Sequence, residues 1–233
     1  MVLCFLLFVA ATACGGTGSR IGEREPTKTW SGYAVDGNYT HVSASWVQPA
    51  VNCSVMQTAA SRIFQGASFW AGFDGYLRSE TIEQTGTTAY CSVNDNPIYE
   101  AWYQLYPQQN VAYAKPVKPG DKISASVTTD GNGHFILTLT DRSEGWTRRK
   151  TATSKTTITS AVVIAEAPTP PYQGYPPTLA EFGTVSFTGA TADGKTFNDL
   201  NGLRQLDMVH NGKPKAVTSP IANGAFTVTW KHS

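Results

Sequence analysis

The chain reads Ile123-Ser124-Ala125-Ser126-Val127 and, after a short interval, Phe135-Ile136-Leu137-Thr138-Leu139-Thr140. Both runs carry apolar side chains at every second position, which is typical of β-strands that bury one face and leave the other in water. Between them stands Asp130-Gly131-Asn132-Gly133, whose Gly and Asn residues tolerate a positive φ. The stretch therefore predicts two strands joined by a turn.

The same alternation recurs outward in both directions, in residues 42–46 and 226–230. No long window repeats at the helical period. Residues 198–209 are ambiguous because their leucines could line a short helix, and we interpret them as a loop followed by a strand. The proline-rich residues 168–177 cannot join a central ladder, so we expect a surface loop there. Many short alternating strands separated by turns indicate an all-β sandwich or jelly roll.

Length and charge narrow the possibilities before any motif is considered. At 233 residues the chain is long enough for one sizeable core, and we expect one domain behind a short leader. Lys and Arg number 18 against 17 Asp and Glu, a formal net charge of +1, and the basic residues form no single run. We therefore expect no nucleic-acid partner. We also expect a monomer.

Residues 1–13 carry no charge, and their apolar stretch is too short to span a bilayer as a helix. With the small residues of Ala11-Thr12-Ala13 they predict a signal peptide, and hence a secreted protein without a transmembrane span. An alternative is that Cys14 is lipidated and anchors the protein at the cell surface. Residues 14–28 show no apolar period and are interpreted as a flexible spacer. The single domain then comprises residues 29–233.

Two cysteines remain within the domain once the leader is removed, Cys53 and Cys91. An even pair in an exported domain suggests a disulfide. On the loop-entropy model, closing the loop between them stabilises the fold by roughly 3–4 kcal/mol. The alternative is two buried free thiols.

Several common catalytic devices are absent from the sequence. There is no G-x-S-x-G elbow, no Walker loop and no H-E-x-x-H motif, and the paired Asp-Thr/Ser-Gly signatures of aspartic peptidases are missing too. The four histidines are scattered without metal-ligand spacing. We therefore expect neither a metal nor a cofactor.

Two predicted strands, residues 69–75 and 99–107, mix aromatic rings with acid and amide groups on one face. In a strand, residues two apart share a face. The residues grouped in this way are Trp70, Gly72 and Asp74 in the first strand and Glu100, Trp102 and Gln104 in the second. Such faces indicate a lined groove rather than a core.

Glu166 closes a run, residues 161–165, that is apolar on both faces. A carboxylate ending so apolar a strand is expensive to leave ionised and unpaired, so burial would raise its pKa and suit it to proton transfer. The alternative is that Glu166 emerges into solvent. In residues 81–87 the alternation sets Glu83 and Gln84 on opposite faces, so only one of them can enter a given groove. By itself, a glutamine in a strand is most often a surface or ladder residue.

Taken together, these segments resemble the glutamic peptidases, also called eqolisins. Seven collinear segments carry the resemblance and cover nearly the whole chain from Trp30 onward. They are Trp30-Ser31-Gly32-Tyr33-Ala34, residues 43–49, 69–75, 83–86, 101–107 and 164–168, and Phe182-Gly183-Thr184-Val185-Ser186-Phe187. Any one of them would be weak, but seven in the family's order make a strong signal.

The resemblance implies two packed antiparallel sheets of the concanavalin-lectin type, with the active site on the concave face of one sheet. It implies that Gln84, in Gln-Thr-Gly, is the catalytic glutamine and Glu166, in Ile-Ala-Glu-Ala-Pro, the catalytic glutamate. Glu166 would take a proton from the attacking water and later pass one to the leaving amine, while Gln84 would donate its side-chain N–H to the oxyanion. Supporting roles are implied for Trp30, Trp70, Asp74, Glu100, Trp102 and Gln104. Gln104 departs from the family, whose members commonly carry an acid there.

The function that follows is that of a secreted acid endopeptidase acting on proteins or peptides, insensitive to pepstatin and independent of metal. The sequence pI of about 7.7 departs from the strongly acidic fungal members, so the acid optimum is an expectation. An alternative is a sugar-binding module or a retaining glycosidase, which would need Asp74 or Glu100 opposite Glu166. A catalytically inactive adhesin or inhibitor on the same scaffold is a third reading.

Overall fold

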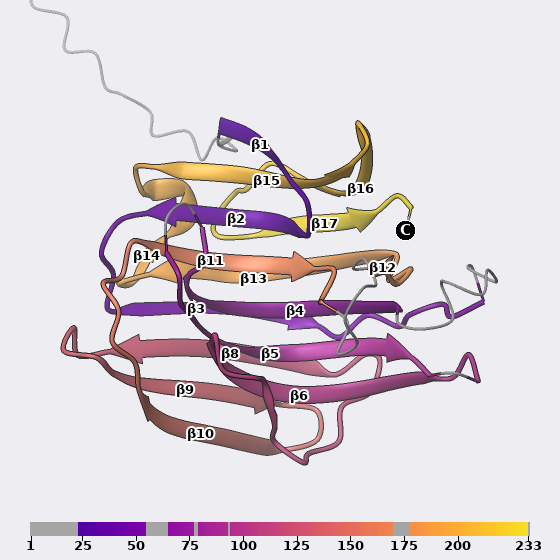
Figure 1. Cartoon of the computed structure of the whole chain (residues 1–233), viewed down its shortest axis with the longest axis horizontal. Helices are drawn as coiled ribbons and strands as arrows, with labels where there is room; N and C mark the ends of the chain where they lie inside the picture. The colour runs from indigo at the N-terminus through magenta and orange to yellow at the C-terminus, as the bar shows by residue number, and fades with distance from the viewer. Residues whose placement is uncertain (1–22, 55–64, 77–78, 93, 170–177, 233) are drawn as a thin grey trace, which may run out of the picture.

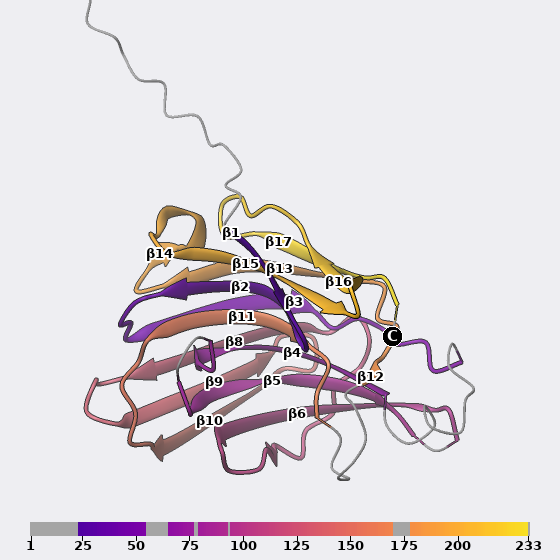
Figure 2. The ribbon, with the colours of Figure 1, turned by 45° about the horizontal axis from the view of Figure 1, so that its top comes forward.

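The computed structural model describes residues 23–54, 65–76, 79–92, 94–169 and 178–232. Within these residues the chain is almost wholly β-structure, and its one short helix is the 3₁₀ turn η1 (Phe197–Asp199). The strands lie in two layers, which Figures 1 and 2 show from two directions. This arrangement confirms the predicted all-β sandwich.

The first layer contains the strands that carry the predicted site residues. Its neighbouring strands are antiparallel, except that β1 at the edge runs parallel to β15 and the short β12 (Thr178–Leu179) runs parallel to β4. In spatial order the layer consists of β1 (Glu23–Thr27), β15 (Leu203–His210), β2 (Trp30–Asp36), β11 (Ser160–Glu166), β4 (Gln65–Asp74), β5 (Ile82–Cys91), β6 (Pro97–Tyr106) and β7 (Val111–Ala112).

The second layer packs behind the first and is antiparallel throughout. In spatial order it consists of β16 (Lys213–Thr218), β17 (Phe226–Trp230), β13 (Thr184–Ala192), β3 (His41–Val47), β8 (Lys122–Thr129), β9 (His134–Asp141) and β10 (Trp146–Thr153). The two-residue β14 (Lys195–Thr196) pairs with the end of β13. The layers are continuous where β15 pairs with β16.

The core fills the space between the layers because each strand turns every second side chain inward. In β8 and β9 every second residue is buried, most of these residues are apolar, and the residues between them are more exposed. From the first layer, Phe69, Ala71 and Phe73 of β4 enter the same core. The alternation of apolar residues in the sequence therefore corresponds to the alternation of buried residues in the strands.

The turn between β8 and β9 uses the predicted chemistry. Gly131 and Gly133 both adopt a positive φ. The carboxylate of Asp130 accepts hydrogen bonds from the backbone N–H groups of Asn132 and His134, at 2.8 and 3.2 Å. Residues 198–209 likewise contain a loop followed by a strand, although a 3₁₀ turn precedes that loop.

The predicted spacer is wrong at its C-terminal end, because residues 23–27 form β1. The segment Glu-Arg-Glu-Pro-Thr has no apolar alternation, since it lies at the sheet edge and is held by backbone pairing with β15. Ion pairs supplement that pairing, between Arg24 and Asp207 at 3.2 Å and between Arg204 and Glu23. The rest of the predicted spacer up to residue 22, the predicted signal peptide and Cys14 lie outside the described residues.

Cys53 and Cys91 form the predicted disulfide. It joins the segment that follows β3, in the second layer, to the end of β5, in the first. Of the predicted proline-rich loop, residues 170–177 lie outside the described part of the chain. Across the described residues, no helix has the length and apolar character needed to cross a membrane.

Candidate active site

One face of the first layer gathers most of the predicted site residues, because the strand register aligns them in rows. The rows run across β11, β4, β5 and β6, and β2 joins the third of them. They are Val162–Gly72–Gln84–Gln104, Ile164–Trp70–Gly86–Trp102 and Trp30–Glu166–Ser68–Thr88–Glu100. Since residues two apart in a strand share a face, all three rows lie on the same face.

Glu166 ends a strand whose preceding apolar residues are fully buried. Its Oε2 accepts a hydrogen bond from the indole Nε1 of Trp70 at 2.9 Å, and the Trp70 ring stands edge-on to Trp30 with centroids 5.0 Å apart. Removal from water raises the pKa of Glu166 to about 7, and the indole N–H groups only partly oppose this rise. A carboxyl with such a pKa can either accept or release a proton near neutrality. The contacts favour a partly buried, hydrogen-bonded carboxyl over a freely solvated strand end.

Gln84 lies in β5 with only 4% of its surface exposed. Its Nε2 donates a hydrogen bond to Oε1 of Gln104 at 2.8 Å, while its own Oε1 is buried without a partner among the described residues. Gly72 faces it on β4, and a Cβ at position 72 would lie 2.9 Å from the Cβ of Gln84. The glycine therefore leaves room for the amide side chain.

Gln84 and Glu166 face the same surface without contacting each other. They lie on strands separated by β4, about 10 Å apart across the sheet, and their rows are about 13 Å apart along it. Trp70 stands between the two rows on β4. The hydrogen bonds described here do not join the two side chains: the Gln84 nitrogen donates to Gln104 on β6, and the Glu166 carboxylate accepts from Trp70 on β4.

Two further predicted residues, Trp102 and Glu100, complete the same face on β6. The indole Nε1 of Trp102 donates to Oγ1 of Thr88 at 2.8 Å, and that hydroxyl also contacts the Ser68 hydroxyl at 2.7 Å. Glu100 is half-buried, and desolvation raises its pKa. It lies three strands from Glu166 in the same row, roughly 14 Å away, which is far beyond the separation of about 5 Å in a retaining glycosidase.

The carboxylate of Asp74 contacts the chain that leads into β11. It ends β4 at a φ of 66° and is fully buried. Its carboxylate accepts hydrogen bonds from the backbone N–H and hydroxyl of Thr159, at 2.7 and 2.9 Å, and from the hydroxyl of Thr156 at 3.3 Å. Asp74 therefore anchors the segment that leads into β11, the strand that Glu166 ends.

Glu83 is the charged residue that the sequence reasoning passed over. It is fully buried on the face of β5 opposite Gln84, and neither carboxylate oxygen has a hydrogen-bond partner among the described residues. Desolvation raises its pKa to about 7, the charge of Asp74 adds to the rise, and the nearby hydroxyls of Ser154 and Thr81 oppose it. The alternation in the sequence places Glu83 on the face of the strand opposite Gln84. In a sandwich that opposite face is turned toward the core, so the burial of Glu83 was open to prediction.

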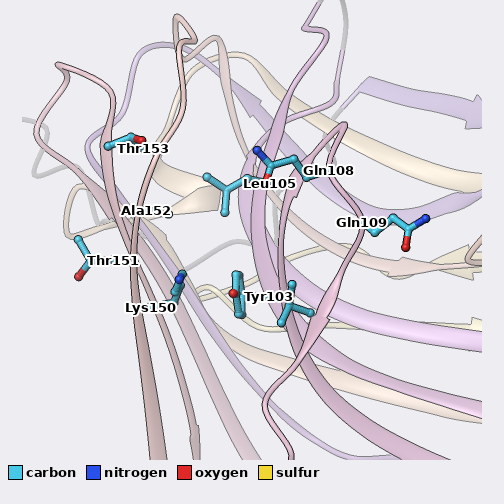
Figure 3. Close-up of a pocket in the computed structure, with 9 residues that line it drawn as sticks. Tyr103, Leu105, Gln108, Gln109, Lys150, Thr151, Ala152 and Thr153 are labelled. Carbon is cyan, nitrogen blue, oxygen red and sulfur yellow. The ribbon is translucent and has the colours of Figure 1, made fainter.

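A cavity of about 280 Å³ lies on the other side of β6 (Figure 3). Tyr103 and Leu105 line it from β6, and Lys150 lines it from β10, with its Nζ 5.4 Å from the centre of the Tyr103 ring. Because Tyr103 and Leu105 alternate with Gln104, this cavity does not open on the face that carries Gln84. It is not part of the candidate site.

The fold is that of solved glutamic peptidases. Scytalido-glutamic peptidase, solved with a peptide-based transition-state analogue, superposes with a TM-score of 0.71 at 21% identity, covering 88% of this chain and 98% of that one. SCP-B, an eqolisin solved with the tripeptide Ala-Ile-His, gives 0.66 at 18% identity with the same coverage. Aspergilloglutamic peptidase from Aspergillus niger gives 0.61 at 25% identity, covering 72% of this chain and 99% of that one.

The sequence itself identifies the family. The Peptidase A4 family matches residues 28–230. This chain belongs to the Peptidase A4 family, and is thus a peptidase of the glutamic type. A comparison with curated protein sequences finds no match.

Proposed function

We propose that this chain is an exported endopeptidase, active in mildly acidic solution, that hydrolyses peptide bonds with Glu166 and Gln84. The observation that carries the proposal is the presence, on one sheet face, of a carboxyl with a raised pKa and a buried amide that is neutral at every pH. The two groups lie in rows on either side of Trp70, so a peptide carbonyl and a water would have to connect them if the pair acts together.

Glu166 is suited to the proton transfers. Ionised, it accepts a proton from the water that attacks the scissile carbonyl; protonated in that step, it donates a proton to the leaving amine. The Trp70 N–H fixes the position of one carboxylate oxygen. Removal of the group from water, which raises its pKa, makes it a stronger base than an exposed glutamate.

Gln84 is suited to stabilise the oxyanion. The Nε2 atom of the amide carries two N–H bonds, and the hydrogen bond to Gln104 uses only one of them. The second can donate to the oxygen that becomes negative in the tetrahedral intermediate, and one such preorganised donor contributes about 3–4 kcal/mol. Because an amide has no charge, it does so without repelling the Glu166 carboxylate.

The pKa of Glu166 sets the expected pH dependence. With a pKa raised to about 7, the carboxylate that begins the reaction becomes scarcer as the pH falls below 7, which gives kcat/KM an ascending limb in the acidic range. We expect activity in mildly acidic solution, where part of the carboxyl is ionised, and a loss of activity in strong acid. The pH profile of kcat/KM on a peptide substrate measures this directly.

Export and substrate class complete the proposal. Residues 1–13 are assigned as a signal peptide, with lipidation of Cys14 as the alternative route to the cell surface, and residues 29–233 as the catalytic domain. A disulfide between Cys53 and Cys91 suits an oxidising compartment. Because the structural relatives named above are peptidases solved with a peptide-based analogue and with a tripeptide, we assign proteins and peptides as substrates.

The test is digestion of a denatured protein by wild type, Gln84→Ala and Glu166→Gln, with and without pepstatin and a chelator. Wild-type cleavage should resist both inhibitors. Gln84→Ala should reduce kcat by a factor of about 10²–10³, and Glu166→Gln should reduce it by about 10²–10⁴. Gln109→Ala and Glu181→Gln, which change the same residue types away from the site, should match wild type. Undiminished cleavage by either site variant would overturn the assignment.

A further inference from the structure

The Gln84 amide is held in one of its two possible orientations. An amide side chain can present either its oxygen or its nitrogen to a neighbour, so the surrounding hydrogen bonds decide which group faces a ligand. Here Nε2 of Gln84 donates to Oε1 of Gln104 at 2.8 Å. Oε1 of Gln84 is buried and has no partner among the described residues. What fixes this orientation must lie beyond Gln84, on β6.

Gln104 is in turn fixed by the backbone. Its Nε2 donates to the carbonyl oxygen of Gln108 at 2.8 Å. That carbonyl belongs to the turn after β6, which is closed by a hydrogen bond from the N–H of Gln108 to the carbonyl of Leu105 at 2.9 Å. A backbone carbonyl can only accept a hydrogen bond, so the Gln104 nitrogen must face it. The Gln104 oxygen must then face Gln84, which dictates the orientation of the second amide.

We propose that Gln104 is a positioning residue, which relays the polarity of the Gln108 carbonyl to Gln84 and so holds the Gln84 amide ready for the oxyanion. This rests on the role proposed for Gln84 above. In this orientation the second N–H of Nε2 is not used by Gln104 and remains for the oxyanion. The relay contains no ionisable group, so its polarity does not change with pH. An acid at position 104, as the sequence resemblance led us to expect, would accept from Gln84 without the turn but would titrate.

Three variants separate this role from a merely structural one. Gln104→Leu removes the relay at similar side-chain size, and Gln104→Glu retains an acceptor for Gln84 while adding a titratable group. Gln108→Ala removes a side chain but keeps the backbone carbonyl, and is the matched control. Each is compared with wild type and Gln84→Ala for kcat, KM and pH profile on one peptide substrate. The side-chain amide signals of Gln84, assigned by their loss in Gln84→Ala, are followed by ¹H–¹⁵N NMR.

Gln104→Leu should lower kcat about tenfold with KM unchanged, as expected when one hydrogen bond that orients the reactive amide is lost. Its Gln84 amide signals should move toward those of a free side chain. Gln104→Glu should recover kcat as the new carboxyl ionises, which adds a limb to the pH profile that wild type lacks. Gln108→Ala should match wild type in both kcat and spectrum.

The results distinguish this inference from the proposed function. If Gln84→Ala is inactive while Gln104→Leu retains full kcat and unchanged Gln84 signals, the positioning role is wrong and the dyad stands. If Gln84→Ala is fully active, the dyad itself fails. A loss in Gln104→Leu that is equally present in Gln108→Ala would show that the turn, rather than the relay, matters, and would also overturn the inference.

Discussion

Replacement of Glu83 by Gln is expected to remove much of the pH dependence of folding. Glu83 is fully buried, its carboxylate has no hydrogen-bond partner among the described residues, and its pKa is raised to about 7 by desolvation. The native state therefore binds this proton more tightly than the unfolded chain, in which the pKa returns to the ordinary value of 4.5. Stability is fully present below pH 4.5 and is lost as the pH rises to about 7.

The size of the effect follows from that rise in pKa. A difference of about 2.5 pH units, at about 1.4 kcal/mol per unit, amounts to about 3.5 kcal/mol of stability lost once the pH is well above 7. Glutamine has nearly the same shape and no charge at any pH. The free energies of unfolding of wild type and Glu83→Gln should therefore agree near pH 4 and diverge by about 3.5 kcal/mol well above pH 7, with the variant more stable.

Urea denaturation followed by tryptophan fluorescence between pH 4 and pH 8 measures this difference. Asp74, Glu100 and Glu166 also have raised pKa values and give a slope of the same sign, but they are present in both proteins. Glu80→Gln, which changes an exposed glutamate close by, should reproduce the wild-type pH dependence. Parallel stability curves for wild type and Glu83→Gln would refute the reasoning.

Two further predictions concern the site. Trp70→Phe removes the indole N–H that stabilises the Glu166 carboxylate, so the pKa of Glu166 should rise further. The ascending limb of the kcat/KM profile should then move to higher pH. An unmoved limb would show that this hydrogen bond does not affect the pKa of the carboxyl. Gly72→Ala places a Cβ 2.5 Å from the Glu83 carbonyl oxygen and 2.9 Å from the Gln84 Cβ. Because these atoms are too close, the substitution should lower the free energy of unfolding, measured by urea denaturation, by roughly 1–3 kcal/mol. It should also reduce kcat. Wild-type stability in Gly72→Ala would contradict the reported closeness of β4 and β5.

The strands were predictable wherever one face is buried, because burial imposes the period of two on the sequence. The segments around Val127, Leu137 and Val228 show this directly. β1 was not predictable, because its side chains are mostly exposed and its pairing depends on a partner strand some 180 residues away in the chain, as the contact between Arg204 and Glu23 shows. Edge strands of this kind leave no alternation to read.

The sequence predicts which site residues of one strand share a face, but not which residues on neighbouring strands lie beside each other. The period of two placed Trp70 with Gly72, and Glu100 with Gln104, yet it says nothing of which residue on one strand stands opposite which on the next. That register depends on long-range pairing and decides that Gln104, not Trp102, lies beside Gln84. Asp74 departs from the simple alternation because a positive φ ends its strand, and its carboxylate turns to the chain before β11.

The bridge between Cys53 and Cys91 bears on how a protein-cleaving enzyme withstands its own activity. Cleavage of any single peptide bond between these two residues leaves the two fragments covalently joined by the disulfide. A molecule nicked there would run as one species on a non-reducing gel and as two after reduction. The disulfide between the two layers would therefore keep the molecule in one covalent piece after a single self-cleavage between residues 53 and 91.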